Sequence, residues 1–123
     1  MKCLSLKQPY AEFLASGKKK IELRTWNTRF RGRFLIHASM TIDKYACKYF
    51  RIDPETLDKG AVVGAADLVG VKQYIDNTEF KKELKKHLAV KGYSIPIYGF
   101  IINNPIRFKE PRRMRGMLGF FEV

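Results

Sequence analysis

The segment GKKKIELRTW, residues 17–26, carries the side chains best suited to binding chemistry in this chain. Its alternation of apolar and polar residues predicts a strand with Glu22, Arg24 and Trp26 on one face, the outer two about 13 Å apart. The Glu22 carboxylate can accept a hydrogen bond from the amino group of cytosine or adenine. The Arg24 guanidinium can hold a phosphate or stack on a base, and Trp26 offers an indole plane for stacking. The segment predicts a site that reads one base.

A structural interpretation of these residues stays open. Glu22 could form an ion pair with Lys19 or Arg24 inside the fold, and Trp26 could simply fill the core. Lys19 could also reach the same cleft as Glu22. The two would then form an acid–base pair, provided that burial shifts both pKa values.

Gln8 precedes Pro9 at the expected start of a helix. Free backbone N–H groups at a helix N-terminus suit a phosphate, and the Gln8 amide could read a base. The alternative is that Gln8 caps the helix while Pro9 fixes its entry.

The chain has 24 Lys and Arg against 12 Asp and Glu, a net charge of +12. Such a field attracts polyanions, although it also serves solubility. One basic cluster follows the strand at Arg29, Arg31 and Arg33, and a second lies near the C-terminus. The second cluster consists of Arg107, Lys109, Arg112, Arg113 and Arg115. We expect the first cluster to contact backbone phosphates, and if both clusters face the cleft they form one electrostatic track along it.

The remaining reactive side chains favour structural roles. Cys3 and Cys47 stand in apolar surroundings without metal-ligand spacing, which predicts buried thiols. A structural zinc site would need all of the two Cys and two His as its four ligands, and the cysteines lack metal-ligand spacing, so we expect no metal or cofactor. We predict that His37 is a core residue and that His87 is exposed on a Lys-rich helix. Asp67 interrupts an apolar strand and should need a polar partner.

The pattern along residues 1–123 predicts a single domain with an α+β fold. We expect a small mixed β-barrel of five to six strands flanked by two to three helices. Gly64 and Gly70 should bend a strand at the corners of the barrel. The expected strands cover 3–6, 20–26, 33–39, 61–71 and parts of the final third, which should be broken at 103–105 and at Pro111. The expected helices follow Gln8 up to Gly17 and cover 41–50 and 76–88.

No apolar run approaches the roughly 20 residues of a membrane span, and the first residues lack a signal-peptide core. We therefore expect a cytoplasmic protein without membrane association.

Residues 4–39, LSLKQPYAEFLASGKKKIELRTWNTRFRGRFLIHAS, resemble the opening motif of the ASCH (activating signal cointegrator homology) domain family. That motif has Ser-x-x-Gln-Pro at a strand end, a short helix ending in Gly, Lys and Glu before Arg-Ser/Thr-Trp, and Arg-Gly before a strand. The later AVVGAADL and YGFIINNPIRF are similar to its downstream strands. The resemblance implies a PUA-like barrel whose relatives bind RNA or modified bases in a cleft beside it. It also implies roles in transcription or translation.

Some ASCH-like proteins are small amidohydrolases that act on 4-acetylcytidine and share Gly-x-Lys-x-x-Thr-x-Arg. This chain keeps Gly17, Lys19 and Arg24, but Glu22 stands where the pattern has its nucleophilic Thr. A carboxylate is a poor substitute for a hydroxyl that must be acylated.

The first prediction is therefore a nucleic-acid-binding module, with RNA favoured over DNA, that holds a base or nucleotide in a cleft. The alternative is a small hydrolase of a modified nucleoside or of RNA, with Lys19 and Glu22 as catalytic residues. A third interpretation is docking onto an acidic protein surface. The predicted contacts to nucleic acid are Gln8, Lys19, Glu22, Arg24, Trp26, Arg29, Arg31, Arg33, Arg112 and Arg113.

Overall fold

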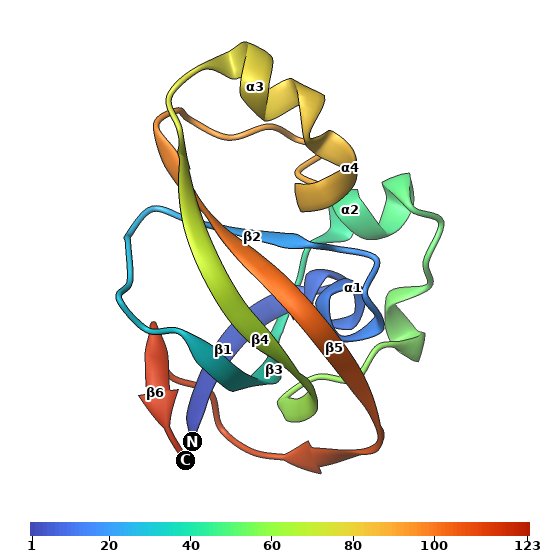
Figure 1. Cartoon of the computed structure of the whole chain (residues 1–123). Coiled ribbons are helices and arrows are strands. Elements are labelled where there is room, and N and C mark those ends of the chain that lie inside the picture. The colour runs from blue at the N-terminus through green and yellow to red at the C-terminus, as the bar shows by residue number, and fades with distance from the viewer.

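Two long antiparallel strands, β4 (Ala61–Tyr74) and β5 (Ile97–Arg113), form the middle of a six-stranded mixed sheet (Figure 1). The structure is a computed structural model that describes residues 1–123. The strand order is β2-β5-β4-β3-β1-β6. The other strands are β1 (Lys2–Gln8), β2 (Ile21–Arg24), β3 (Gly32–Ile42) and β6 (Phe120–Glu122). The helices are α1 (Tyr10–Ser16), α2 (Lys44–Tyr49), α3 (Asn77–Lys82), α4 (Leu84–His87) and a 3₁₀ turn at Pro54–Thr56.

The predicted α+β fold with a mixed sheet is confirmed, but the sheet does not close into a barrel. β1 pairs in parallel with β3 along its length, whereas its antiparallel pairing with β6 covers only residues 2–4. β2 pairs only with β5. The free edges of β1 and β2 are instead bridged by a side chain, since Arg24 Nη2 donates to the Ser5 carbonyl oxygen at 2.9 Å. This opening in the sheet is where the candidate site lies.

Irregular pairing bends β4 and β5. Register shifts fall between Val62 and Gly64, between 65 and 67, and between 68 and 70. Bulges of this kind increase local twist and let a sheet curl. The predicted bends at Gly64 and Gly70 are thus confirmed. The predicted breaks in the last third are wrong, because β5 runs through 103–105 and Pro111 as one strand.

Gly64 is the glycine with the least room. A Cβ there would lie 2.2 Å from the Ile106 carbonyl oxygen, whereas a Cβ at Gly70 would meet only a side-chain carbon at 3.5 Å. Gly64→Ala should therefore lower the free energy of unfolding by about 2 kcal/mol or more, and Gly70→Ala by less than about 0.5 kcal/mol. Urea unfolding of both variants measures this. Equal losses would contradict the backbone clash.

Helix α1 supports the segment that follows it. Pro9 precedes the helix, and Gly17 ends it with φ 87°, a left-handed conformation that glycine adopts without strain. Both features agree with the sequence prediction. The helix buries Phe13 and Leu14 against the sheet. The tight turn after it sends the chain back toward the open edge of β1, and the backbone N–H of Lys19 donates to Phe13 O at 2.9 Å.

The expected helix 76–88 is two short helices, α3 and α4, that meet at Glu83. Asp76 caps α3 as predicted, accepting from the Thr78 N–H. The Glu83 carboxylate accepts from Lys72 Nζ at 2.7 Å and from the Tyr74 hydroxyl at 2.5 Å. These contacts tie the helix pair to β4. The expected helix 41–50 is also shorter, covering only α2.

Glu83 predicts a pH dependence of stability. Burial alone would raise the pKa of its carboxyl, but hydrogen bonds from Lys72, Tyr74 and Lys86 hold the pKa at about 2. A depressed pKa stabilises the fold above the unfolded value, and this contribution is lost as pH falls from about 4.5 toward 2. Glu83→Gln should lower the free energy of unfolding by up to about 3 kcal/mol at pH 7. The difference in unfolding free energy between the variant and wild type should shrink below pH 4.5. Unfolding titrations across pH measure this, with the exposed Glu79→Gln as control. If the difference in unfolding free energy between Glu83→Gln and wild type did not change with pH, the charge of Glu83 would not be the source of the stabilisation.

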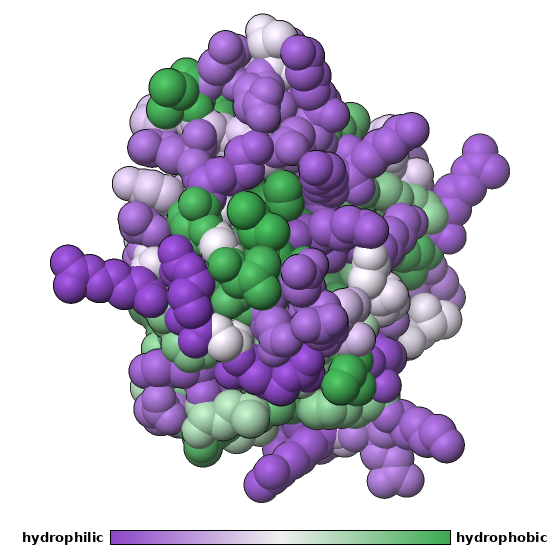
Figure 2. All heavy atoms as spheres, in the orientation of Figure 1, coloured by the Kyte–Doolittle hydropathy of each residue, from purple (hydrophilic) through white to green (hydrophobic).

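Most of the face seen in Figure 2 is hydrophilic, with apolar side chains gathered near its centre over β4 and β5. The two termini lie together, and the Met1 ammonium donates to Val123 O at 3.0 Å (Figure 1). None of the helices has the length and apolar character needed to cross a bilayer.

Candidate nucleotide site

A cavity of about 560 Å³, here called the β1–β2 cavity, fills the opening between the two unpaired strand edges. β1 contributes residues 5–7, β2 contributes residues 22–24, and the loop after α4 contributes residues 91–93. Its charged and hydroxyl side chains include Lys7, Tyr10, Lys19, Glu22, Arg24, Ser39, Asp43, Lys91 and Tyr93. The cavity exists because β1 and β2 do not pair.

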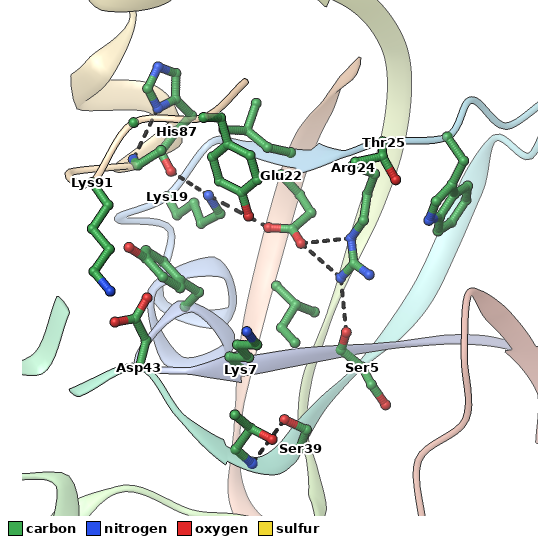
Figure 3. Close-up of a pocket in the computed structure, with 18 residues that line it drawn as sticks. Ser5, Lys7, Lys19, Glu22, Arg24, Thr25, Ser39, Asp43, His87 and Lys91 are labelled. Carbon is green, nitrogen blue, oxygen red and sulfur yellow. Dashed lines mark hydrogen bonds and ion pairs between the residues drawn. The ribbon is translucent and has the colours of Figure 1, made fainter. Parts of the chain in front are cut away.

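A row of three charges crosses this cavity (Figure 3). Glu22 Oε2 accepts from Arg24 Nε at 2.9 Å and Nη2 at 2.8 Å, and Glu22 Oε1 lies 3.6 Å from Lys19 Nζ. Arg24 Nη2 also donates to Ser5 O on β1. Only 10% of the Glu22 side chain is exposed. The alternation along β2 places Glu22 and Arg24 on one face, and their mutual contacts fix both side chains in position.

Lys19 is the most deeply buried cation of the cavity, with 4% of its side chain exposed. Its Nζ donates to the His87 carbonyl oxygen and lies 5.0 Å from the centre of the Tyr10 ring. Burial lowers the pKa of the ammonium, and the Glu22 carboxylate opposes that shift by favouring the charged form. Lys19 therefore gives up its proton more readily than a solvated lysine, a property expected of an acid–base group.

Trp26 lines one end of the cavity and is half-buried. Its indole packs edge-on against Phe100 at 5.3 Å and Phe120 at 5.9 Å between ring centres. The Arg24 guanidinium carbon lies 6.0 Å from the indole centre. Trp26 therefore belongs both to the edge of the core and to the wall of the cavity. The structure brings Lys19, Glu22, Arg24 and Trp26 together.

Gln8 does not line the cavity. Its side chain is fully buried, Nε2 donates to Asp58 O at 2.8 Å, and Oε1 accepts from the Glu12 N–H at 2.9 Å. Both ends of the amide are thus occupied by the backbone. Gln8 joins the end of β1 to α1 and to the loop before β4, and it has no group left to read a base.

The basic clusters lie in three places. Arg29 and Arg31 line a separate hollow of about 530 Å³ that shares no residue with the β1–β2 cavity. Arg33 is occupied, since Nε lies 3.0 Å from Asp67 Oδ1 and Nη2 donates to Asn104 O. This pairing supplies the partner that Asp67 was expected to need.

Arg112 and Arg113 lie exposed at the end of β5. Arg113 lines a hollow that adjoins the cavity, as does Arg115 of the same cluster, whereas Arg112 lines neither. Of the other predicted cluster members, Arg107 forms ion pairs with Glu12 and Asp58 at 2.8 Å each.

The two histidines are both buried. His37 is a core residue as predicted. Its Nε2 donates to Met114 O at 2.6 Å, so Nδ1 accepts from the Ser5 hydroxyl at 2.8 Å. The prediction that His87 is exposed is wrong, because it stacks on Phe80 with ring centres 4.2 Å apart. The break between α3, which carries Phe80, and α4, which carries His87, turns the two rings toward each other, and the sequence pattern of a single helix did not show this.

Several lining residues were not predicted as site residues. The spacing of Tyr10 from Phe13 and Leu14 indicated only the apolar face of a helix. No sequence pattern around Lys7, Asp43, Lys91 or Tyr93 indicated that they line a cavity. Cys3 and Cys47 are buried free thiols, as predicted. No three His, Cys, Asp or Glu side chains lie close enough together to hold a metal ion.

Comparison with known proteins identifies this arrangement as a familiar fold. Three crystal structures of an ASCH protein from Zymomonas mobilis superpose on the chain, the unmutated protein with a TM-score of 0.66 and two mutant forms with 0.65 each. Each is 18% identical in sequence. The aligned region spans 91% of this chain and 72% of the unmutated Zymomonas mobilis protein. For the two mutant forms it spans 91–92% of this chain and 73–74% of theirs. No curated protein matches the sequence.

The ASCH domain family itself matches residues 4–112, which include the three charges of the row, Lys19, Glu22 and Arg24, and Ser5, which bridges the row to β1. The match extends through β5, so the opening in the sheet lies inside it. The chain belongs to the ASCH domain family.

Proposed function

We propose that this protein binds a nucleic-acid strand, RNA in preference to DNA, and holds one nucleotide in the β1–β2 cavity. The observation that carries the proposal is the buried row of Lys19, Glu22 and Arg24 inside a cavity large enough for a small ligand. Charged groups held in fixed positions orient a ligand without having to reorganise on binding.

The charges of the cavity favour an anionic ligand with a polar edge. Four cationic side chains, Lys7, Lys19, Arg24 and Lys91, line it with two carboxylates, Glu22 and Asp43. In this proposal the base amino group donates to Glu22, and Lys7 and Lys91 at the rim bind the phosphate. The aromatic walls, Tyr10, Trp26 and Tyr93, provide surfaces for the base plane.

A panel of labelled 12-residue oligonucleotides tests this proposal: single- and double-stranded RNA and single- and double-stranded DNA. Single-stranded RNA should bind best in a fluorescence anisotropy titration at 50 mM salt, because only an unpaired base can enter the cavity. Equal binding of the duplexes would contradict insertion of a base. The absence of binding to all four would contradict the proposal itself.

A second candidate function, hydrolysis of a modified nucleoside or of RNA, is favoured by one observation. Buried Lys19, with its lowered pKa, lies 3.6 Å from the Glu22 carboxylate. Such a pair can pass a proton to or from a bound water or leaving group. Wild type should then consume an acylated cytidine or a short RNA at a rate that Lys19→Met lowers at least about 100-fold. Chromatography of the products measures this. Substrate that stays intact with wild type would contradict the hydrolase function and leave the binding function standing.

A further inference from the structure

A second hollow adjoins the β1–β2 cavity and shares Ser5 and Ser39 with it. We call it the C-terminal hollow, because residues 113–118 form one of its walls. Its volume is about 620 Å³, and the end of β3 and the turn before β4 form the remaining wall. The two hollows are therefore neighbours, with Ser5 of β1 and Ser39 of β3 at their common border.

The C-terminal hollow is lined by cations without counter-charges. Lys59, Arg113 and Arg115 line it, and no Asp or Glu does. None of these three takes part in an ion pair of the chain, in contrast to Arg24, Arg33 and Arg107. Their charge is free to meet an anion.

Apolar side chains stand beside these cations. Met40, Met117 and Leu118 line the same hollow, and 98% of Leu118 is exposed. Exposed apolar groups next to unpaired cations match a ligand that alternates flat apolar groups with negative charges. A nucleic-acid strand has this composition, since each nucleotide carries a base and a phosphate.

The wall that carries Arg113 and Arg115 is held in place. His37 Nε2 donates to Met114 O at 2.6 Å, and the Met114 N–H donates to Gly60 O at 3.0 Å. Gly116 passes so close to the core that a Cβ there would lie 2.4 Å from Ser5 Oγ. The arginines therefore lie on a segment that is anchored at Met114 and that passes close to Ser5, which also lines the cavity.

We infer that the C-terminal hollow is a second nucleotide subsite. A strand with one nucleotide in the β1–β2 cavity continues over Ser5 and Ser39, and its next phosphates bind Lys59, Arg113 and Arg115. The neighbouring base contacts Met117 and Leu118. The inference rests on the proposed function and adds the path that the bound strand takes away from the cavity. The strand leaves the cavity toward residues 113–118, not toward Arg29 and Arg31, whose hollow shares no residue with the cavity.

The test compares ligands of increasing length on wild type and on the double variant Arg113→Ala/Arg115→Ala. The ligands are a nucleoside monophosphate and single-stranded RNA of two, four and six residues. Wild-type affinity should rise at least 10-fold from the monophosphate to the tetranucleotide. The double variant should bind the monophosphate as wild type does and lose most of that gain. Its log–log salt slope for the hexanucleotide should fall by about 1.4, the release expected for two contacts to a single strand.

A matched control is Lys81→Ala/Lys82→Ala, which removes two exposed cations from α3, outside both hollows. It should keep the gain with length and most of the salt slope. If the arginine variant gains affinity with length as wild type does, the second subsite is refuted while the cavity site stands. If wild type binds neither monophosphate nor oligonucleotide, the proposed function fails first. Preference for an acidic peptide over RNA at the arginines would also overturn the inference.

Discussion

Glu22→Gln should weaken the binding of a nucleoside monophosphate by at least about 10-fold. Glu22 is the acceptor that we assign to the base amino group, and a hydrogen bond to a charged group is worth roughly 1.5–3 kcal/mol. The amide keeps the shape of the side chain but replaces one acceptor oxygen with a donor. In either orientation of the amide, that donor would face a cation: Arg24, which now donates twice to Glu22 Oε2, or Lys19, whose Nζ lies 3.6 Å from Oε1. Isothermal titration calorimetry measures the change.

The control for this variant is Glu12→Gln. Glu12 is also a glutamate paired with an arginine, since Arg107 Nε lies 2.8 Å from its Oε1, but it lies outside the cavity. The control should bind the nucleotide as wild type does. Removing the Glu22 charge also leaves Lys19 and Arg24 without their shared anion, so thermal unfolding must show that the variant is folded during the titration. Equal affinity in folded Glu22→Gln and wild type would remove Glu22 from the site.

Affinity for single-stranded RNA should fall by about 300-fold or more between 50 and 200 mM salt if six or more phosphates are engaged. The physical reason is release of the cations condensed on the strand when lysines and arginines replace them. Lys91→Ala should reduce the log–log slope by about 0.7, because it removes one phosphate contact at the rim. Trp26→Ala should weaken binding by roughly 1–3 kcal/mol and leave the slope unchanged, since stacking involves no charge. Anisotropy titrations at five salt concentrations measure both the affinity and its log–log salt slope for each variant.

Two outcomes would contradict the assignment of salt-dependent affinity to the cations and of salt-independent affinity to stacking on Trp26. A wild-type slope near zero would show that the net charge of +12 does not contribute to binding. A Trp26→Ala variant with full affinity would remove stacking on the indole, in agreement with a purely structural role against Phe100 and Phe120.

The sequence predicted best where a local pattern decides the structure. Alternation along residues 20–26 anticipated that Glu22 and Arg24 share a face, because the two-residue period of a strand is a property of the backbone. Gly17 anticipated the end of α1 for the same kind of reason, since its left-handed conformation is a local requirement.

Features set by tertiary contacts could not be predicted in this way. Gln8 is bound by Asp58 O, fifty residues further along the chain, and no pattern near Gln8 reports that contact. The opening between β1 and β2 depends on which strand edges find partners, whereas the spacing of apolar residues shows only that strands exist. Lys91 and Tyr93 lie in a loop without periodicity, and only the packing of α4 brings them over the cavity.

The most direct measurement is the intrinsic fluorescence of Trp26 during titration with cytidine and adenosine monophosphates at low salt. Trp26 is the only tryptophan of the chain and lines the β1–β2 cavity, so its emission should respond to a ligand that enters there. We expect saturable quenching with one ligand per chain, which Glu22→Gln shifts to at least 10-fold higher concentration and Glu12→Gln leaves in place. An emission spectrum that does not change up to millimolar nucleotide, or that changes equally in both variants, would contradict a nucleotide site between β1 and β2.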